Sequence, residues 1–414
     1  MKKPFFYILL FCFIISGVSA KKLSKINLSQ RYAEDSFTKV QNLVYHSAED
    51  SSTIFLLINL HHLKYVYSGS TSRQARFSVS YELYDSWDAK QPADTSSIIF
   101  TDNQLFDGEM EMVVEFDVKT PFPGNYILKY ELVDLFYPDN RFIDIIEIGK
   151  TESSLRQNFF VTDDNGFPVF GNFLPSGYKF RVYYNNPTAN QLLVRYFDKK
   201  FPLAKPPFAV EKDQTYKFEP DSMYTVALNN GSSDLITLPF HGIYHFQTDI
   251  SKPDGLTLFR FDDGFPEVNS PALAIAPLRY LSTEYEFNTL LSYEDYKTAV
   301  DSFWLERASQ QPQRAKNMIK RYYSRVQEAN IMFSSYQEGW KTDRGLLYII
   351  YGPPSEVYRN EDEEEWIYGE RGNPLSMRFF FYKVENPFTS NDFQLNRSTN
   401  YKTSWYIAIE NWRR

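Results

Sequence analysis

Residues 339–354 read Gly-Trp-Lys-Thr-Asp-Arg-Gly-Leu-Leu-Tyr-Ile-Ile-Tyr-Gly-Pro-Pro, and this stretch decides how the C-terminal third of the chain folds. Gly339 can end a preceding helix by taking a left-handed backbone conformation. Thr342 or Asp343 can accept hydrogen bonds from the amides of a tight turn before Gly345. The stretch therefore predicts a helix that stops and a chain that turns sharply.

The apolar run that follows the turn is the next element. Residues 346–351 are uninterrupted, contain two isoleucines and have the length of a buried strand. The Gly-Pro-Pro sequence 352–354 would end that strand, because proline cannot donate to a ladder of hydrogen bonds. The residues that we assign to this structural motif are Gly339, Trp340, Thr342, Asp343, Arg344, Gly345, Gly352, Pro353, Pro354, Trp366 and Tyr368.

The segments around the motif predict an α+β module. Ser292 and Asp295 resemble a capping box before a helix that runs to about Trp304, and a longer amphipathic helix follows Pro312. These two helices are expected to pack as a hairpin. On the other side of the motif we expect a helical turn at 355–358. Three strands should then form a small antiparallel sheet, at 366–368, 377–382 and 404–409.

The motif resembles the signature of the GWxTD-domain family of bacterial envelope proteins, a family of Bacteroidetes type. The resemblance extends from the helical residues 303–307 to residues 365–368. It implies a C-terminal domain over residues 269–414 and a place in the cell envelope. The family has no established reaction, so no activity follows from the resemblance.

The region before the module has the pattern of strands. Residues 75–84 alternate apolar and polar side chains with period two, and Pro and Gly clusters recur between short strand-like runs. Turn signals at this spacing are typical of immunoglobulin-like β-sandwiches. We predict one sandwich over residues 21–150 and a second over 151–268.

The first residues predict export. Residues 1–20 combine two lysines, an apolar run at 5–15 and small residues at 18–20, which is the order of a cleaved secretory signal. Cys12, the one cysteine, lies inside that run, so the mature chain would have no thiol. No other segment approaches the roughly 18 apolar residues of a spanning helix. We expect a protein of the periplasm or the outer membrane with no transmembrane segment in its mature chain.

Length and charge limit the classes of function. The 414 residues suggest two or three domains at about 150 residues each. The formal net charge is −8, and no block of lysine or arginine interrupts the acidic background. Nucleic acid is therefore not an expected partner.

Several residues could carry chemistry, and each has a plainer interpretation. His241 and His245 would lie about 13 Å apart on a strand, too far to share a metal ion. The acidic run 361–365 and the turn 163–166 could attract calcium, but a solvated loop and a simple turn are favoured. Asp343 could be a catalytic acid beside Arg344 as an anion clamp, but a buried structural aspartate is favoured. We assign no catalytic residue, no metal ligand and no cofactor.

These observations favour a binding or scaffolding protein whose partners are other envelope proteins. Tandem sandwiches would present loops to partners, and the C-terminal module would dock through the anchors Trp340, Tyr351, Trp366 and Tyr368. The alternatives are an enzyme that acts on an envelope glycan or peptide, with Asp343 or a carboxylate of 361–365 as the acid, and a calcium-stabilised adhesin.

Overall fold

A computed structural model describes residues 22–33, 40–67, 72–104, 111–153, 155–211 and 218–414. The predicted signal peptide and Cys12 lie outside these residues. The described chain is mainly β, with several antiparallel sheets and a helical region near the C-terminus, which confirms the predicted fold class at this level. No helix in the described part has both the length and the apolar character that crossing a membrane requires.

The first β unit consists of two antiparallel sheets that enclose one core. One sheet contains β1 (Gln41–Tyr45), β2 (Ser51–Asn59) and β6 (Glu111–Lys119). The other contains β3 (Val66–Tyr67), β4 (Arg73–Tyr84), β7 (Gly124–Asp134) and β8 (Arg141–Lys150), with β5 (Asp94–Gln104) paired to β4. The period of two in β4 turns Phe77, Val79 and Leu83 inward, where they meet Ile54 and Val114 of the facing sheet.

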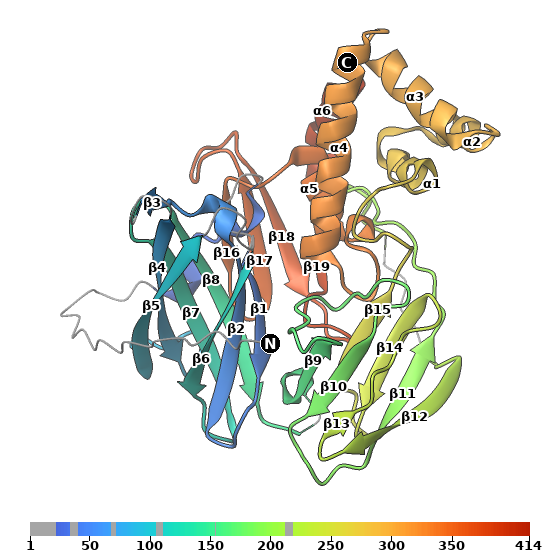
Figure 1. The fold of residues 1–414 in the computed structure, drawn as a ribbon. Helices are drawn as coiled ribbons and strands as arrows, with labels where there is room; N and C mark the ends of the chain where they lie inside the picture. Colours follow the sequence, from blue (N-terminus) through green and yellow to red (C-terminus); the bar gives the residue numbers. More distant parts are fainter. Residues whose placement is uncertain (1–21, 34–39, 68–71, 105–110, 154, 212–217) are drawn as a thin grey trace.

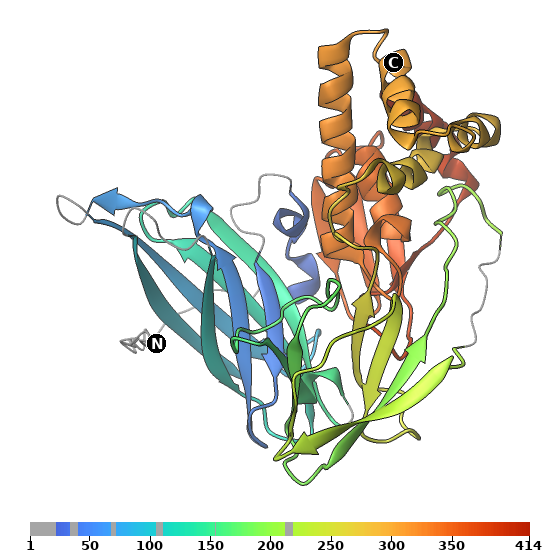
Figure 2. The same cartoon turned by 45° about the vertical axis from the view of Figure 1, so that its right-hand side comes forward.

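The second β unit is one continuous antiparallel sheet of seven strands in the order β15-β14-β11-β12-β13-β10-β9. Its strands are β9 (Phe159–Asp163), β10 (Phe180–Tyr184), β11 (Gln191–Phe197), β12 (Ser222–Asn229), β13 (Ser232–Ser233), β14 (Gly242–Gln247) and β15 (Leu256–Arg260). The sheet is continuous because the two-residue strand β13 pairs with both β12 and β10. Figures 1 and 2 show this unit beside the first one, with the helices of the C-terminal module above them.

The C-terminal module combines helices with a small antiparallel sheet. Its helices are α1 (Pro271–Ile275), α2 (Glu284–Leu291), α3 (Tyr296–Arg307), α4 (Pro312–Phe333), α5 (Asp343–Tyr351) and α6 (Lys402–Arg413). Its sheet has the order β16 (Glu356–Arg359), β17 (Glu363–Tyr368), β18 (Met377–Lys383) and β19 (Phe393–Leu395). The long helix α4 and the hairpin β17–β18 stand where the sequence predicted them.

Two predicted strands are helices. Residues 346–351 belong to α5, in which every residue from Asp343 to Ile350 is buried. A helix that is buried all round shows no period, so its short apolar run looks like a strand. Residues 404–409 belong to α6, whose buried residues Trp405, Ala408, Ile409 and Trp412 follow helical spacing.

Three boundary predictions were also wrong. Asp295 alone caps α3, and the capping box is formed by Thr283 and Glu286 on α2. Residues 356–359 form strand β16 rather than a helical turn, because they pair with β17. Helix α4 ends at Phe333, so Gly339 does not end it.

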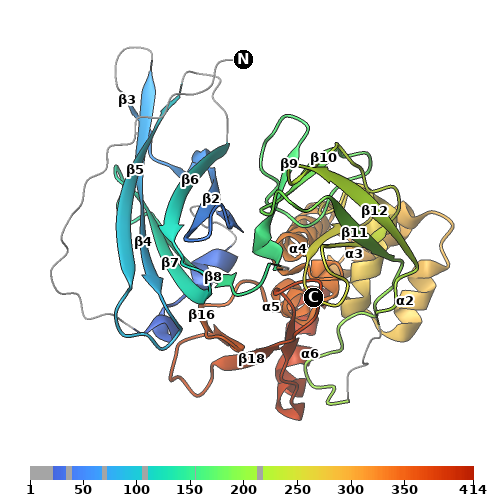
Figure 3. The ribbon, with the colours of Figure 1, turned by 90° about the horizontal axis from the view of Figure 1, so that it is seen from below.

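The N-terminal segment 22–33 joins the first β unit to the C-terminal module. Leu23, Leu28 and Tyr32 are buried in the same core as the tryptophans of the C-terminal helices. The Leu28 amide donates to the Val357 carbonyl on β16 at 2.8 Å. Figure 3 shows the C-terminal module packed against the first β unit through β16, so its core carries contacts from distant parts of the sequence.

Candidate functional site

The motif builds a close contact between α4, the 3-10 turn Gly339–Lys341 and α5. A Cβ atom on Gly339 would lie 1.9 Å from the Ala329 carbonyl oxygen of α4. A Cβ atom on Gly345 would lie 1.9 Å from the Gly339 carbonyl oxygen. Both positions need glycine because the backbones meet with no room for a side chain.

Polar groups then hold the turn in place. The Trp340 amide donates to Asn330 Oδ1 at 3.1 Å, and Asn330 Nδ2 donates to the Pro266 carbonyl at 3.0 Å. Thr342 caps α5, since its Oγ1 accepts from the Gly345 amide at 3.1 Å. The predicted role of Thr342 as an acceptor in this turn is confirmed, although the element it starts is a helix.

Asp343 is engaged by two groups of the protein itself. Its Oδ2 accepts from the Leu395 amide at 2.7 Å, and its Oδ1 accepts from the Arg397 guanidinium at 2.5 Å. The side chains of Asp343 and Arg397 are 9% and 7% exposed. Asp343 is therefore the buried structural aspartate that the sequence favoured.

Arg344 and Glu364 form a second buried ion pair, with 3.6 Å between Arg344 Nη1 and Glu364 Oε2. Glu364 Oε1 also accepts from Trp366 Nε1 at 2.6 Å and from the Tyr32 hydroxyl at 3.0 Å. Burial by itself would raise the pKa of Glu364, but the charges of Arg344 and Arg359 outweigh it, so the pKa is lowered. The acidic run 361–365 is thus not wholly a solvated loop.

The end of α5 is closed by Gly352 and Arg325. Gly352 has a φ of 88°, and a Cβ atom there would lie 2.4 Å from Arg325 Nη2. Arg325 Nη1 donates to the Ile349 carbonyl at 3.4 Å, which uses one of the last acceptors of the helix. Tyr368 donates to the Gly352 carbonyl at 2.9 Å, and Pro353 and Pro354 follow with Pro354 buried.

The predicted docking anchors are packing residues in this structure. Trp366 is fully buried and Trp340 is 9% exposed. Tyr351 and Tyr368 are half-buried and face each other, with ring centroids 5.5 Å apart. Trp340 packs against Tyr280, and Trp366 packs against Tyr32 and Phe381, so in this structure both tryptophans serve the interior of the module.

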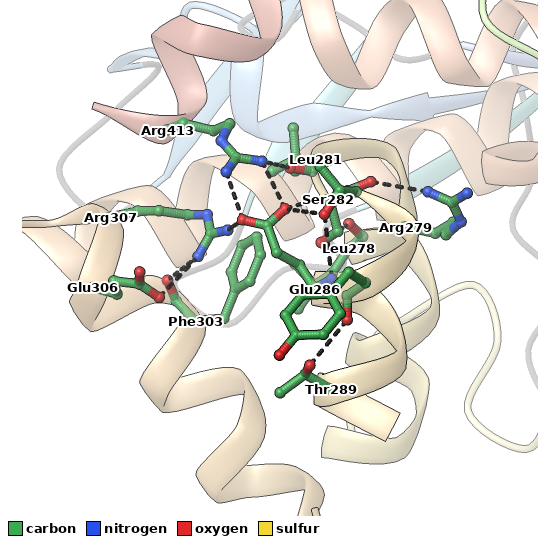
Figure 4. Close-up of polar contacts among 12 residues, drawn as sticks. Leu278, Arg279, Leu281, Ser282, Glu286, Thr289, Phe303, Glu306, Arg307 and Arg413 are labelled. Atoms are coloured by element: carbon green, nitrogen blue, oxygen red, sulfur yellow. Dashed lines mark hydrogen bonds and ion pairs between the residues drawn. The ribbon is translucent and has the colours of Figure 1, made fainter. Parts of the chain in front are cut away.

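Sequence reasoning missed a polar cluster around Glu286 on α2 (Figure 4). Arg413 donates to both carboxylate oxygens, at 2.6 and 3.0 Å, and Arg307 Nη2 donates at 3.2 Å. The Thr283 amide donates to Glu286 at 2.8 Å, which completes the capping box. The cluster ties α2 to α3 and to the end of α6, and the Thr-x-x-Glu spacing at 283–286 was the signal that could have revealed it.

The histidines and the Asp163 turn, which the sequence offered as candidates for chemistry, do not form a common site in the structure. His245 is buried, and both ring nitrogens are engaged, with Thr257 Oγ1 at 2.8 Å and the Pro253 carbonyl at 2.9 Å. Burial lowers its pKa to about 4. His241 is exposed, and Asp163 accepts from the amides of its own turn. No group of three or more His, Cys, Asp or Glu that could hold a metal ion occurs among the described residues.

Comparison with known proteins bears on the C-terminal part. Residues 242–414 match the family model described as GWxTD domain. This part of the chain is a GWxTD domain. The match begins at Gly242, the first residue of β14, so it starts earlier than the predicted boundary at 269 and takes in two strands of the second β unit. The motif residues described above all lie within this match.

Other comparisons add little. No curated protein matches the chain. Among solved structures, a transglutaminase of red sea bream aligns at 11% identity with a TM-score of 0.18, over 55% of this chain and 32% of that enzyme. The alignment spans only about a third of the enzyme, and so low a TM-score carries no argument about fold or activity.

The close contact of the glycines predicts the effect of adding one methyl group. Gly345→Ala should lower the free energy of unfolding by roughly 3 kcal/mol, because the methyl group overlaps the Gly339 carbonyl. Gly171→Ala is the matched control, since its added Cβ would meet ordinary contacts at 3.7 Å. Urea unfolding followed by tryptophan fluorescence measures both. Equal stability of the two variants would contradict the close contact.

The Glu286 cluster predicts a dependence on pH. The hydrogen bonds from Arg413 lower the pKa of Glu286 from its ordinary 4.5 to about 2. A lowered pKa stabilises the fold above pH 4.5, and this contribution is lost as the pH falls towards 2. Glu286→Gln should therefore be less stable than wild type at neutral pH, and the difference should shrink in acid. Glu306→Gln, at a side chain 79% exposed, should keep a small and constant difference.

Proposed function

We propose that this chain is an exported envelope protein, in the periplasm or associated with the outer membrane, that acts as a non-catalytic binding or scaffolding component. In this proposal the two β units are immunoglobulin-like binding modules, and the two antiparallel sheets that enclose one core support this assignment for the first unit. The partners are other envelope proteins. The resemblance to the envelope family and the order of residues 1–20 support the compartment.

The observation that carries the proposal is the state of Asp343. Both of its oxygens accept short hydrogen bonds from groups of the same chain, and its side chain is 9% exposed. Glu364, the buried carboxylate of the acidic run, is likewise engaged by Arg344, Tyr32 and Trp366. These two acids therefore serve the packing of the module, whereas the enzyme alternative requires an acid that faces a substrate.

The surface offers a different place for a partner. Helices α2 and α3 lie at the outer edge of the C-terminal module (Figures 1 and 2). Four large side chains of these helices and of the turn between them are exposed, namely Tyr285 at 82%, Leu291 at 44%, Tyr293 at 37% and Tyr296 at 39%. Exposed tyrosine is favoured at protein interfaces because its ring is apolar and its hydroxyl tolerates water. We name these four residues the α2–α3 corner and propose it as the docking surface.

Substitution of Asp343 distinguishes a structural role of this residue from a catalytic one. Asp343→Asn should lower the free energy of unfolding by roughly 3 kcal/mol, because the buried Arg397 loses its counter-charge. Asp301→Asn removes a similar charge from an exposed pair with Lys297, so its stability should stay close to that of wild type. Thermal and urea unfolding compare the two. An Asp343→Asn protein as stable as wild type would contradict the structural role and favour the enzyme.

Crosslinking in intact cells tests the docking surface. A photo-reactive residue at position 285 of the tagged chain should capture one envelope protein reproducibly. The same residue at position 137, a tyrosine 55% exposed in the first β unit, is the matched control. Tyr285→Ser should abolish capture at neighbouring corner positions while the melting temperature stays unchanged. Equal capture from both positions, or none from either, would sink the assignment of the corner.

A further inference from the structure

A basic cavity lies between α4, the end of α5 and α6. Its volume is about 420 Å³, and its walls include Arg314, Asn317, Arg321, Tyr351, Trp412 and Arg414. The C-terminus of the chain lies beside the end of α4 in Figure 1, which is how Arg414 reaches the same cavity as Arg314. The volume falls in the range of sites for small molecules.

The charge of this cavity differs from that of the whole chain. Three arginines line it and no acidic side chain does, whereas the chain has a net charge of −8. Arg314, Asn317, Met318 and Arg321 share one face of α4 at spacings of three and four residues. Residues 312–327 of α4 contain five basic side chains and no acidic one.

This charge distribution opposes the helix itself. The N-terminal end of a helix carries partial positive charge, and acidic side chains are the ones that stabilise it. The first turn of α4 has no acidic residue and contains Arg314. Helix α4 therefore gives up stabilisation at this end.

The floor of the cavity is aromatic and firmly held. Trp412 Nε1 donates to the Ile350 carbonyl at 3.0 Å. The guanidinium groups of Arg321 and Arg325 lie 5.3 and 5.6 Å from the Trp412 ring centroid. Arg325 is buried and donates to the end of α5, so it orients the floor, while Arg314 and Arg414 are exposed at the rim. Arg414 Nε also lies 3.7 Å from Oε2 of Glu410, a residue that does not line the cavity.

We propose that this cavity binds a phosphomonoester whose phosphoryl group is attached to an apolar or aromatic body. The planar guanidinium fork matches two oxygens of a phosphoryl group, and a dianion can pair with both rim arginines, Arg314 and Arg414. A carboxylate offers a single charge for the same pair. The apolar lining residues Met318, Ile350 and Ala408, together with the edge of Trp412, then contact the apolar body of the ligand. The site is separate from the α2–α3 corner and does not depend on a scaffolding role.

Calorimetric titration of the full chain with phenyl phosphate tests the site. Wild type should bind phenyl phosphate and should not bind phenol, because the phosphoryl group supplies the attraction. The double variant Arg314→Gln, Arg414→Gln should weaken binding by about tenfold or more. Its matched control is Lys316→Gln, Lys320→Gln, which removes the same charge from exposed positions of α4 outside the cavity and should bind like wild type.

A second measurement distinguishes a free ligand from a lipid. Vesicles of phosphatidylcholine with phosphatidic acid present the same phosphomonoester on a membrane surface. Co-sedimentation that is lost in the arginine variant and kept in the lysine variant would support the site with a lipid as its source. Melting temperatures verify that both variants fold, and the single variant Arg314→Gln replaces the double one if that protein is unstable. Equal loss in both variants, or no binding of either probe, would overturn the proposal.

Discussion

The C-terminal module depends on one steric constraint, the contact of three backbone segments at Gly339 and Gly345. The carbonyl of Ala329 on α4 lies where a side chain of Gly339 would be, and the carbonyl of Gly339 lies where a side chain of Gly345 would be. Because α5 starts at this contact, its direction is fixed relative to α4. Interiors pack at the density of organic crystals, so such a contact leaves little freedom to adjust.

The fixed position of α5 has electrostatic consequences. Its first two residues, Asp343 and Arg344, are carried into the interior, where unpaired charges would be costly. Residues from distant segments supply the opposite charges, since Arg397 pairs with Asp343 and Glu364 pairs with Arg344. Glu364 in turn accepts from Tyr32 of the N-terminal segment. The steric contact thus leads, through buried charges, to the joining of the first β unit with the C-terminal module.

Sequence reasoning succeeded where side chains have one buried face. The period of two in β4 and the amphipathic stripe of α4 both predicted their elements, because half of each surface meets water. It failed for α5, which is buried on all sides and shows no period. Within the acidic run, alternation along β17 turns Glu364 to the same face as Trp366, and only the pairing with β18 reveals that this face is the interior.

The residues that hold the GWxTD domain together are not the residues that are free to bind a partner. The signature residues Gly339, Thr342, Asp343 and Gly345 are buried, and their polar atoms bond to the chain itself. A group already committed in this way has no capacity left for a ligand unless the fold opens. We therefore look for binding outside the signature, and the exposed tyrosines of the α2–α3 corner and the arginines beside Trp412 are the surfaces that we propose for it. Such surface residues can differ between proteins that share one signature, so a shared GWxTD fold is compatible with different partners.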